Sequence, residues 1–64
     1  MDKKSIAQRL KELRGDRSMK EVADACKIAK STLAMYESGR RIPKDEIKVR
    51  IACFFKVSVE TLFF

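Results

Sequence analysis

The stretch from Ser18 to Pro43 reads SMKEVADACKIAKSTLAMYESGRRIP and decides the fold. Ser18 and Glu21 form the Ser-x-x-Glu pattern of a capping box, which predicts that a helix begins directly after the serine. A turn follows, and a second helix is predicted over 30–38, where Gly39 can adopt the left-handed conformation that ends a helix. The stretch therefore predicts two short helices joined by a tight turn and followed by a loop rich in basic residues.

The rest of the chain predicts three more helices, on the evidence of capping residues and apolar periodicity. One is expected over 3–14 with Asp2 as its N-cap. Another is expected over 43–55, where the fixed φ of the opening proline suits a helix entrance. A last short helix follows Ser58. We therefore predict an all-α fold with five helices in one domain over residues 1–64.

Length and charge narrow the functional classes. A chain of 64 residues buries only about 60% of its unfolded surface, which leaves no room for a large enzyme pocket. It carries 15 Lys and Arg against 9 Asp and Glu, a net charge of +6. Such a charge favours a polyanionic partner. The alternative is a solvated surface that merely happens to be basic.

The composition gives no support for catalysis, metal binding or membrane insertion. The chain has no histidine, no usefully spaced carboxylate pair and no glycine-rich phosphate loop, so we expect no enzyme, cofactor or small-molecule ligand. Cys26 and Cys53 are too few and too far apart for a metal site or a disulfide scaffold. The longest apolar run, Ile51 to Phe55, is far shorter than the roughly 20 residues that span a bilayer. We therefore expect a cytoplasmic protein without a membrane partner.

The predicted helix over 30–38 has two different sides when its residues are placed at about 100° each. Leu33 and Tyr36 lie on one side, with Glu37 at its border. The opposite side carries only uncharged residues, namely Ser31, Ala34, Met35 and Ser38. In a chain with 38% charged residues, a solvent-facing side would normally carry charge. This side is therefore interpreted as a contact surface, the alternative being a surface of merely small residues.

Positive charge is concentrated around this helix. Between positions 27 and 44 the only acid is Glu37, and the basic residues are Lys27, Lys30, Arg40, Arg41 and Lys44. Lys and Arg side chains neutralise phosphates and release condensed counterions, which supplies affinity but no sequence information. The pattern predicts binding to double-stranded DNA, with discrimination left to contacts in the groove.

These residues resemble the prokaryotic and phage helix-turn-helix regulators of the Cro and repressor type, also called XRE-type. The resemblance covers about residues 5–63 and rests on IAQRLKELR, on the segment 18–39 and on the closing VSVETLF. Its most specific part is Glu-Ser-Gly at 37–39 followed by RRIP. The resemblance implies a compact lambda-repressor-like domain, in which the third helix enters the major groove and the second crosses the DNA backbone.

The resemblance also assigns roles by position. It implies base contacts from Lys30, Ser31, Ala34 and Met35. With the basic cluster, it implies phosphate contacts from Ser18, Met19, Lys27, Arg40, Arg41 and Lys44. A structural ion pair is implied between Arg14 and Glu37. The function expected from these roles is that of a transcriptional regulator, a repressor bound as a dimer to a two-fold operator.

The chain departs from the family pattern at several positions. Met19 stands where glutamine usually binds a phosphate, and its thioether cannot donate a hydrogen bond, so backbone amides would replace it. Ala29 replaces the usual Ser or Thr cap of the third helix. Lys27 and Lys56 occupy turn positions where glycine is common, and a non-glycine residue at positive φ costs on the order of 1 kcal/mol.

The C-terminal part suggests self-association. On the helix over 43–55, Val49 and Cys53 face away from the apolar stripe, and the chain ends in two phenylalanines. We predict a homodimer that buries Val49, Cys53, Phe63 and Phe64, with half-sites about 34 Å apart on the DNA. One alternative is that these residues complete the core of a monomer. Another is a protein-binding regulator, such as an antitoxin or antirepressor, that uses this apolar patch.

Overall fold

In the computed structural model, which describes residues 2–64, helices begin behind the capping residues that the sequence indicates. Side-chain oxygens of Asp2, Ser18 and Ser58 accept hydrogen bonds from backbone N–H groups three residues on, at 2.8, 3.0 and 3.0 Å. Residues 2–64 form five helices and no strand, which confirms the predicted all-α fold. The helices are α1 (Lys3–Arg14), α2 (Met19–Ala25), α3 (Lys30–Glu37), α4 (Asp45–Phe55) and α5 (Val59–Phe63).

Two predicted boundaries are wrong. The third helix ends at Glu37 rather than Ser38, which is its C-cap. The fourth begins at Asp45 rather than Pro43, because Lys44 is extended at φ −68° and ψ 161° and occupies the N-cap position. Pro43 therefore lies outside the helix, where it is buried. The structure gives neither α3 nor α4 a side-chain cap, since Ala29 and Lys44 make no capping hydrogen bond.

The ends of α2, α3 and α4 share one closing pattern. In each, a backbone N–H donates at 3.0 Å to a carbonyl five residues earlier, the pairs being Ile28 to Ala23, Arg40 to Met35 and Val57 to Ala52. The residue before each donor is left-handed, as this kind of ending requires. These residues are Lys27 at φ 60°, Gly39 at φ 77° and Lys56 at φ 57°. The positive φ values predicted for the two lysines are therefore confirmed.

Replacing Lys27 by glycine is expected to raise the melting temperature by roughly 4–8 °C. Relief of the left-handed strain is worth about 1 kcal/mol, and a domain of this size converts that into such a shift. The carbonyl of residue 27, which accepts from Arg50 at 3.5 Å, is unaffected by the change. Thermal unfolding followed by circular dichroism measures the shift. Lys27→Ala is the matched control, because alanine keeps the Cβ and should gain nothing.

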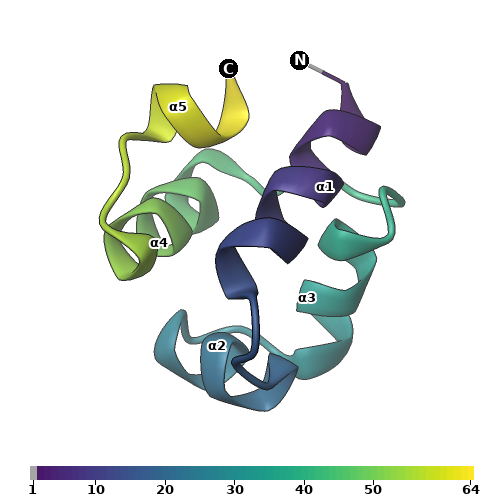
Figure 1. Cartoon of the computed structure of the whole chain (residues 1–64), viewed down its shortest axis with the longest axis vertical. Coiled ribbons are helices and arrows are strands. Elements are labelled where there is room, and N and C mark those ends of the chain that lie inside the picture. Colours follow the sequence, from purple (N-terminus) through teal and green to yellow (C-terminus); the bar gives the residue numbers. More distant parts are fainter. Residues whose placement is uncertain (1) are drawn as a thin grey trace.

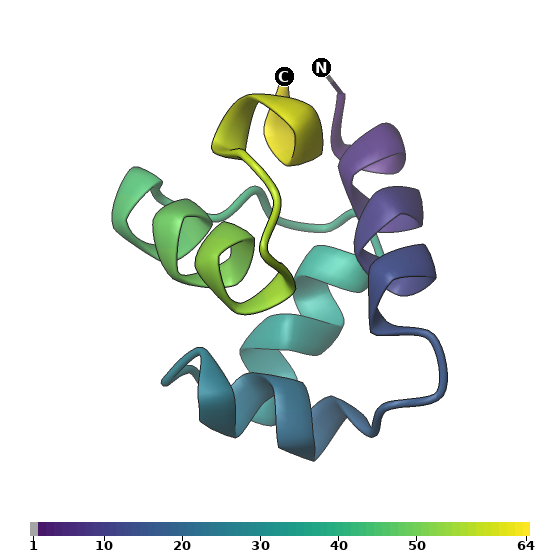
Figure 2. The same ribbon diagram turned by 60° about the vertical axis from the view of Figure 1, so that its left-hand side comes forward.

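The helices enclose one core. α3 packs against α1 and α2, while α5 packs against α4 and α1. Figures 1 and 2 show α4 and α5 on one side of α1, so that α3 keeps an open side at the right of Figure 1. Cys26 is part of the core, where burial raises the pKa of its thiol. No helix among the described residues is long and apolar enough to cross a membrane.

The predicted dimer surface needs one correction at the end of α5. Phe63 is 1% exposed and is the largest fully buried side chain among the described residues, so it completes the core and is not available to a partner. Phe64 is 67% exposed and Val49 57% exposed, and Cys53 is also exposed. The ammonium of Lys48 lies 5.7 Å from the Phe63 ring centroid and 4.7 Å from that of Phe64, which ties the chain end to α4.

Candidate nucleic-acid interface

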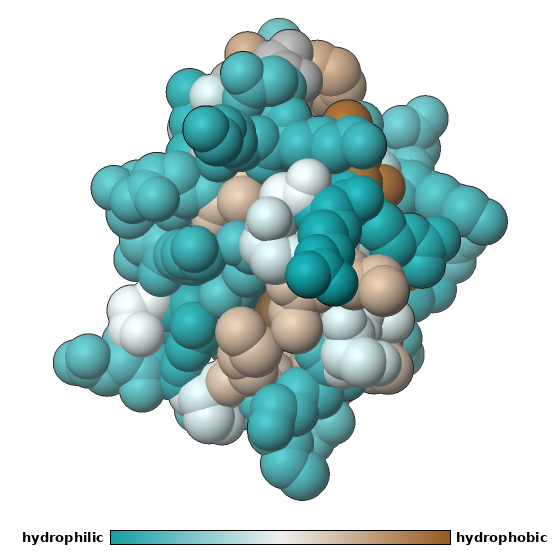
Figure 3. All heavy atoms as spheres, turned by 90° about the vertical axis from the view of Figure 1, so that its right-hand side faces the viewer, coloured by the Kyte–Doolittle hydropathy of each residue, from teal (hydrophilic) through white to brown (hydrophobic). Residues whose placement is uncertain are grey.

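α3 presents its uncharged side to solvent. Leu33 and Tyr36 are buried and hold the opposite side against the core. On the outward side, Met35 is 39% exposed and Ala34 is half-buried. Ser31 and Ser38 are exposed there as well, and Lys30 is exposed at the N-terminal edge of this side. Figure 3 shows the face that carries α3, where residues of intermediate hydropathy gather in the middle and hydrophilic residues surround them.

A two-pronged ion pair fixes the end of α3 to α1. Arg14 donates from Nε to one carboxylate oxygen of Glu37 at 2.8 Å and from Nη2 to the other at 3.0 Å. These hydrogen bonds raise the pKa of Arg14 above its usual value. Its third donor, Nη1, reaches the carbonyl of Arg17 at 2.9 Å, in the link between α1 and α2. One guanidinium of α1 thus holds both the end of α3 and the link that leads to α2.

This pair also shapes the electrostatics of the outward face. Glu37 is the only acid between positions 27 and 44, and it is buried against Arg14. The basic residues of the same segment are exposed, namely Lys27, Lys30, Arg40, Arg41 and Lys44. The segment 27–44 therefore exposes positive charge to solvent, with no exposed acid of its own to offset it. Such a surface is suited to binding a polyanion.

The basic loop is held at the C-terminal end of α3. Gly39 has φ 77°, a conformation that favours glycine. A Cβ added there would lie 3.7 Å from the Lys3 carbonyl oxygen, an ordinary contact, so the requirement is conformational rather than spatial. The next N–H, that of Arg40, donates to the Met35 carbonyl at 3.0 Å. Its backbone position is thereby fixed relative to α3.

The start of α2 lies beside the outward side of α3. Met19 is half-buried and shares with Ala34 and Ser38 a hollow of about 200 Å³, which Lys11, Arg14 and Glu37 also line. Lys11 brings a further positive charge to this surface from α1, and sequence reasoning missed it. The available signal was its spacing, since a residue three positions before Arg14 lies on the same side of a helix.

Lys27 is set apart from the other predicted phosphate-contacting residues. It follows the end of α2 opposite to Ser18 and Met19, and it lines a hollow of about 290 Å³ with Ala25, Arg50, Cys53 and Phe54. Its carbonyl accepts a hydrogen bond from Arg50 of α4. The structure thus places Lys27 against α4, whereas Met19, Ala34 and Ser38 meet on the side of α3.

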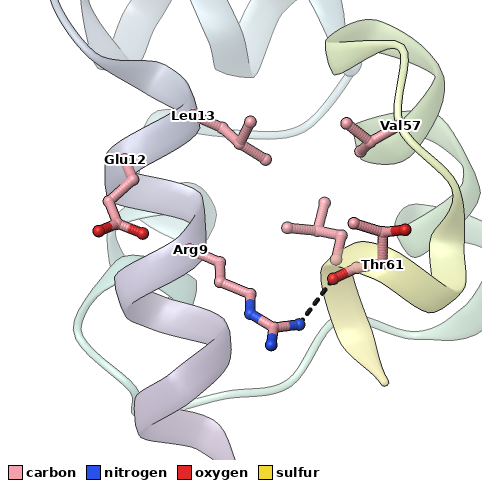
Figure 4. A pocket seen from close by; sticks show the side chains of 6 residues that line it. Arg9, Glu12, Leu13, Val57 and Thr61 are labelled. Atoms are coloured by element: carbon pink, nitrogen blue, oxygen red, sulfur yellow. Dashed lines mark hydrogen bonds between the residues drawn. The ribbon is translucent and has the colours of Figure 1, made fainter.

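A larger hollow of about 350 Å³ lies between α1 and residues 57–62, in the connection after α4 and in α5 (Figure 4). Arg9 and Leu13 of α1 face Val57, Thr61 and Leu62 across it, while Glu12 borders it with its carboxylate pointing away (Figure 4). Arg9 donates from Nη1 to the Thr61 carbonyl at 2.6 Å, so its charge supports the C-terminal part of α5. Among residues 2–64, no three His, Cys, Asp or Glu side chains come together in a metal-binding group.

Comparison with known proteins gives one match. The model of the helix-turn-helix family matches residues 6–62, which is most of the chain and includes α2, α3 and the basic loop. No curated protein matches the chain significantly, and no solved structure does.

Proposed function

The chain belongs to the helix-turn-helix family of the Cro and repressor (XRE) type, and from this we propose that it is a transcriptional repressor binding a two-fold DNA operator as a homodimer. The family is one of DNA-binding regulators and not of enzymes. In this proposal α3 lies in the major groove and α2 crosses the DNA backbone. The observation that carries it is the exposed, uncharged outward side of α3, bordered by exposed cationic residues, while Glu37, the one acid between positions 27 and 44, is buried. We also propose that the protein acts in the cytoplasm.

The outward side of α3 is proposed to contact the bases directly. Lys30 and Ser31 stand at its first turn, where an ammonium can donate to guanine O6 or N7 and a hydroxyl can bind several bases. Ala34 and Met35 complete the proposed base-contacting set. Lys30, Ser31 and Met35 are exposed and Ala34 is half-buried, which supports the assignment because none of them belongs to the core.

Phosphate contacts are proposed on both sides of this helix. Arg40, Arg41 and Lys44 supply charge from the loop after α3, and all three are exposed. At the start of α2, the hydroxyl of Ser18 accepts a hydrogen bond from the Glu21 N–H and keeps its own proton to donate. Near Met19, backbone amides take the place of a donating side chain. Lys27 is exposed beside α4, apart from the other residues of this set, and its proposed phosphate contact would come from that side of the molecule.

The proposed dimer uses the exposed apolar residues that α4 and the chain end leave open. Val49 and Cys53 are four residues apart on α4 and therefore share one side of it. Phe64 is held beside α4 by Lys48. A second copy would cover these three side chains and place two α3 helices about 34 Å apart, one turn of DNA.

Val49→Asp is expected to weaken self-association by roughly tenfold or more, because an unpaired carboxylate would be buried at the interface. Sedimentation at micromolar concentration should find a dimer for the unmodified chain and a monomer for the variant. Ile42→Asp is the control, since Ile42 is also an exposed apolar residue but lies in the basic loop. A chain that sediments as a monomer while occupying both half-sites would contradict the proposed interface.

Selection of bound sequences from a random pool of duplex DNA, repeated at two salt concentrations, tests the function itself. The expected result is a two-fold consensus and an affinity that falls steeply as salt is raised. Failure to enrich any sequence, together with weak binding to all DNA, would refute the proposal. It would favour the protein-binding alternative, in which the exposed Val49 and Phe64 contact another regulator.

A further inference from the structure

The last turn of α3 offers DNA no charged side chain that is free to bind a base. Both carboxylate oxygens of Glu37 are held by Arg14. The hydroxyl of Ser38 at the C-cap donates to a main-chain carbonyl of α3 at 3.1 Å, so its proton is already used. Free donors on the outward side of α3 are therefore confined to the first turn, at Lys30 and Ser31.

Between that first turn and Ser38, the outward side is apolar. Met35 is 39% exposed, and Ala34 is half-buried next to it. Met19 of α2 lines the same hollow as Ala34, so the apolar surface continues from α3 onto α2. In the major groove the apolar group that a base pair presents is the 5-methyl group of thymine. The chemistry of this surface fits that group.

We propose that Ala34 and Met35 recognise thymine through its 5-methyl group, so that each half-site contains a thymine whose selection depends on that methyl. The inference rests on the proposed placement of α3 in the major groove. Cytosine in the same position would present an amino donor to an apolar surface and lose its water without a replacement partner. This part of α3 has no free donor with which to select a base, so the contact with the methyl group provides the selectivity instead.

The test removes only the methyl group. Each thymine of the selected operator is replaced in turn by deoxyuridine, which keeps the other groove-facing atoms of the pair, and the Kd is measured at one salt concentration. We expect roughly a fourfold loss of affinity at one or two positions in each half-site, which is what burial of one methyl group is worth. Thymines elsewhere in the operator should show almost no change.

Two matched variants assign the effect to α3. In Met35→Gln, the ratio of affinities for thymine and uracil should fall toward one at the sensitive positions, because the apolar contact from Met35 is lost and only that from Ala34 remains. Ile42→Gln should keep the ratio of the unmodified chain, since Ile42 is 42% exposed but lies outside α3. Ala34→Ser provides a second variant on the proposed surface, with a smaller change in side-chain volume.

The possible failures are distinguishable. If a defined operator is bound and no thymine responds to uracil, the methyl inference is overturned while the proposed function stands. The methyl inference also fails, again without the proposed function, if uracil weakens binding but neither Met35→Gln nor Ala34→Ser changes the ratio. If no sequence is preferred over random DNA, both the inference and the proposed function fall.

Discussion

Replacing Arg14 by methionine is expected to lower the melting temperature by more than 10 °C. The change leaves the Glu37 carboxylate, whose side chain is 3% exposed, without its partner. Breaking a buried ion pair on one side costs about 3 kcal/mol or more, and each kcal/mol shifts the melting temperature of a small domain by roughly 4–8 °C. Since 64 residues supply only about 3–10 kcal/mol of net stability, the loss is large. Thermal and urea unfolding both measure it.

Two further variants separate the charge from the packing. Glu37→Gln should cost about half as much, because the Arg14 side chain left behind is 22% exposed and can be hydrated. The double variant Arg14→Met with Glu37→Leu should recover most of the stability, since apolar residues of similar volume replace buried pairs well. If Arg14→Met melts within 3 °C of the unmodified chain, by that same conversion the pair contributes little.

Helix starts could be predicted from the sequence because their signals are local. A capping side chain reaches an N–H only three residues away, so Asp2, Ser18 and Ser58 mark their helices without reference to the rest of the fold. The left-handed lysines at 27 and 56 were different. Nothing in the chemistry of lysine favours positive φ, and only the resemblance to a family with glycine at these positions indicated it.

The start of α4 could not be placed because a proline suits more than one position near a helix N-terminus. Pro43 would satisfy the first turn of a helix equally well, and no side chain in the segment forms a cap that fixes the choice. The burial of Phe63 rather than Phe64 was equally hidden. α5 has only five residues, too few for periodicity to show which of two adjacent aromatic side chains faces the core.

The part of the candidate site that lies on α3 alone could be predicted from the sequence better than the parts formed by two or more helices. The outward side of α3 follows from a periodicity of 3.6 residues, so Ser31, Ala34 and Met35 could be grouped in advance. The approach of Lys11 to this side depends on how α1 crosses α3. The hollow between Met19 and Ala34 depends in the same way on how α2 crosses α3. A crossing angle is set by the packed side chains of both helices and cannot be derived from either segment alone.

Removing both loop arginines by Arg40→Ala and Arg41→Ala is expected to weaken DNA binding by roughly 60-fold per half-site at 0.1 M salt. Each phosphate contact contributes about 0.9 to the slope of log affinity against log salt, or about eightfold at 0.1 M relative to 1 M. The slope should therefore fall by about 1.8 per half-site. Operator and random DNA should lose affinity together, because phosphate contacts carry no sequence information.

The position of the charge, and not its amount, is what this prediction tests. Arg41→Ala alone lowers the net charge of +6 by one, and Lys56→Gln does the same at the turn between α4 and α5, on the other side of the molecule from α3. The first change should reduce affinity about eightfold and the salt slope by about 0.9 per half-site, while the second should leave both nearly unchanged. Titrations by fluorescence anisotropy at four salt concentrations give both quantities. Equal effects of the two variants would mean that the DNA responds to overall charge, and the loop after α3 would then have no special place in the interface.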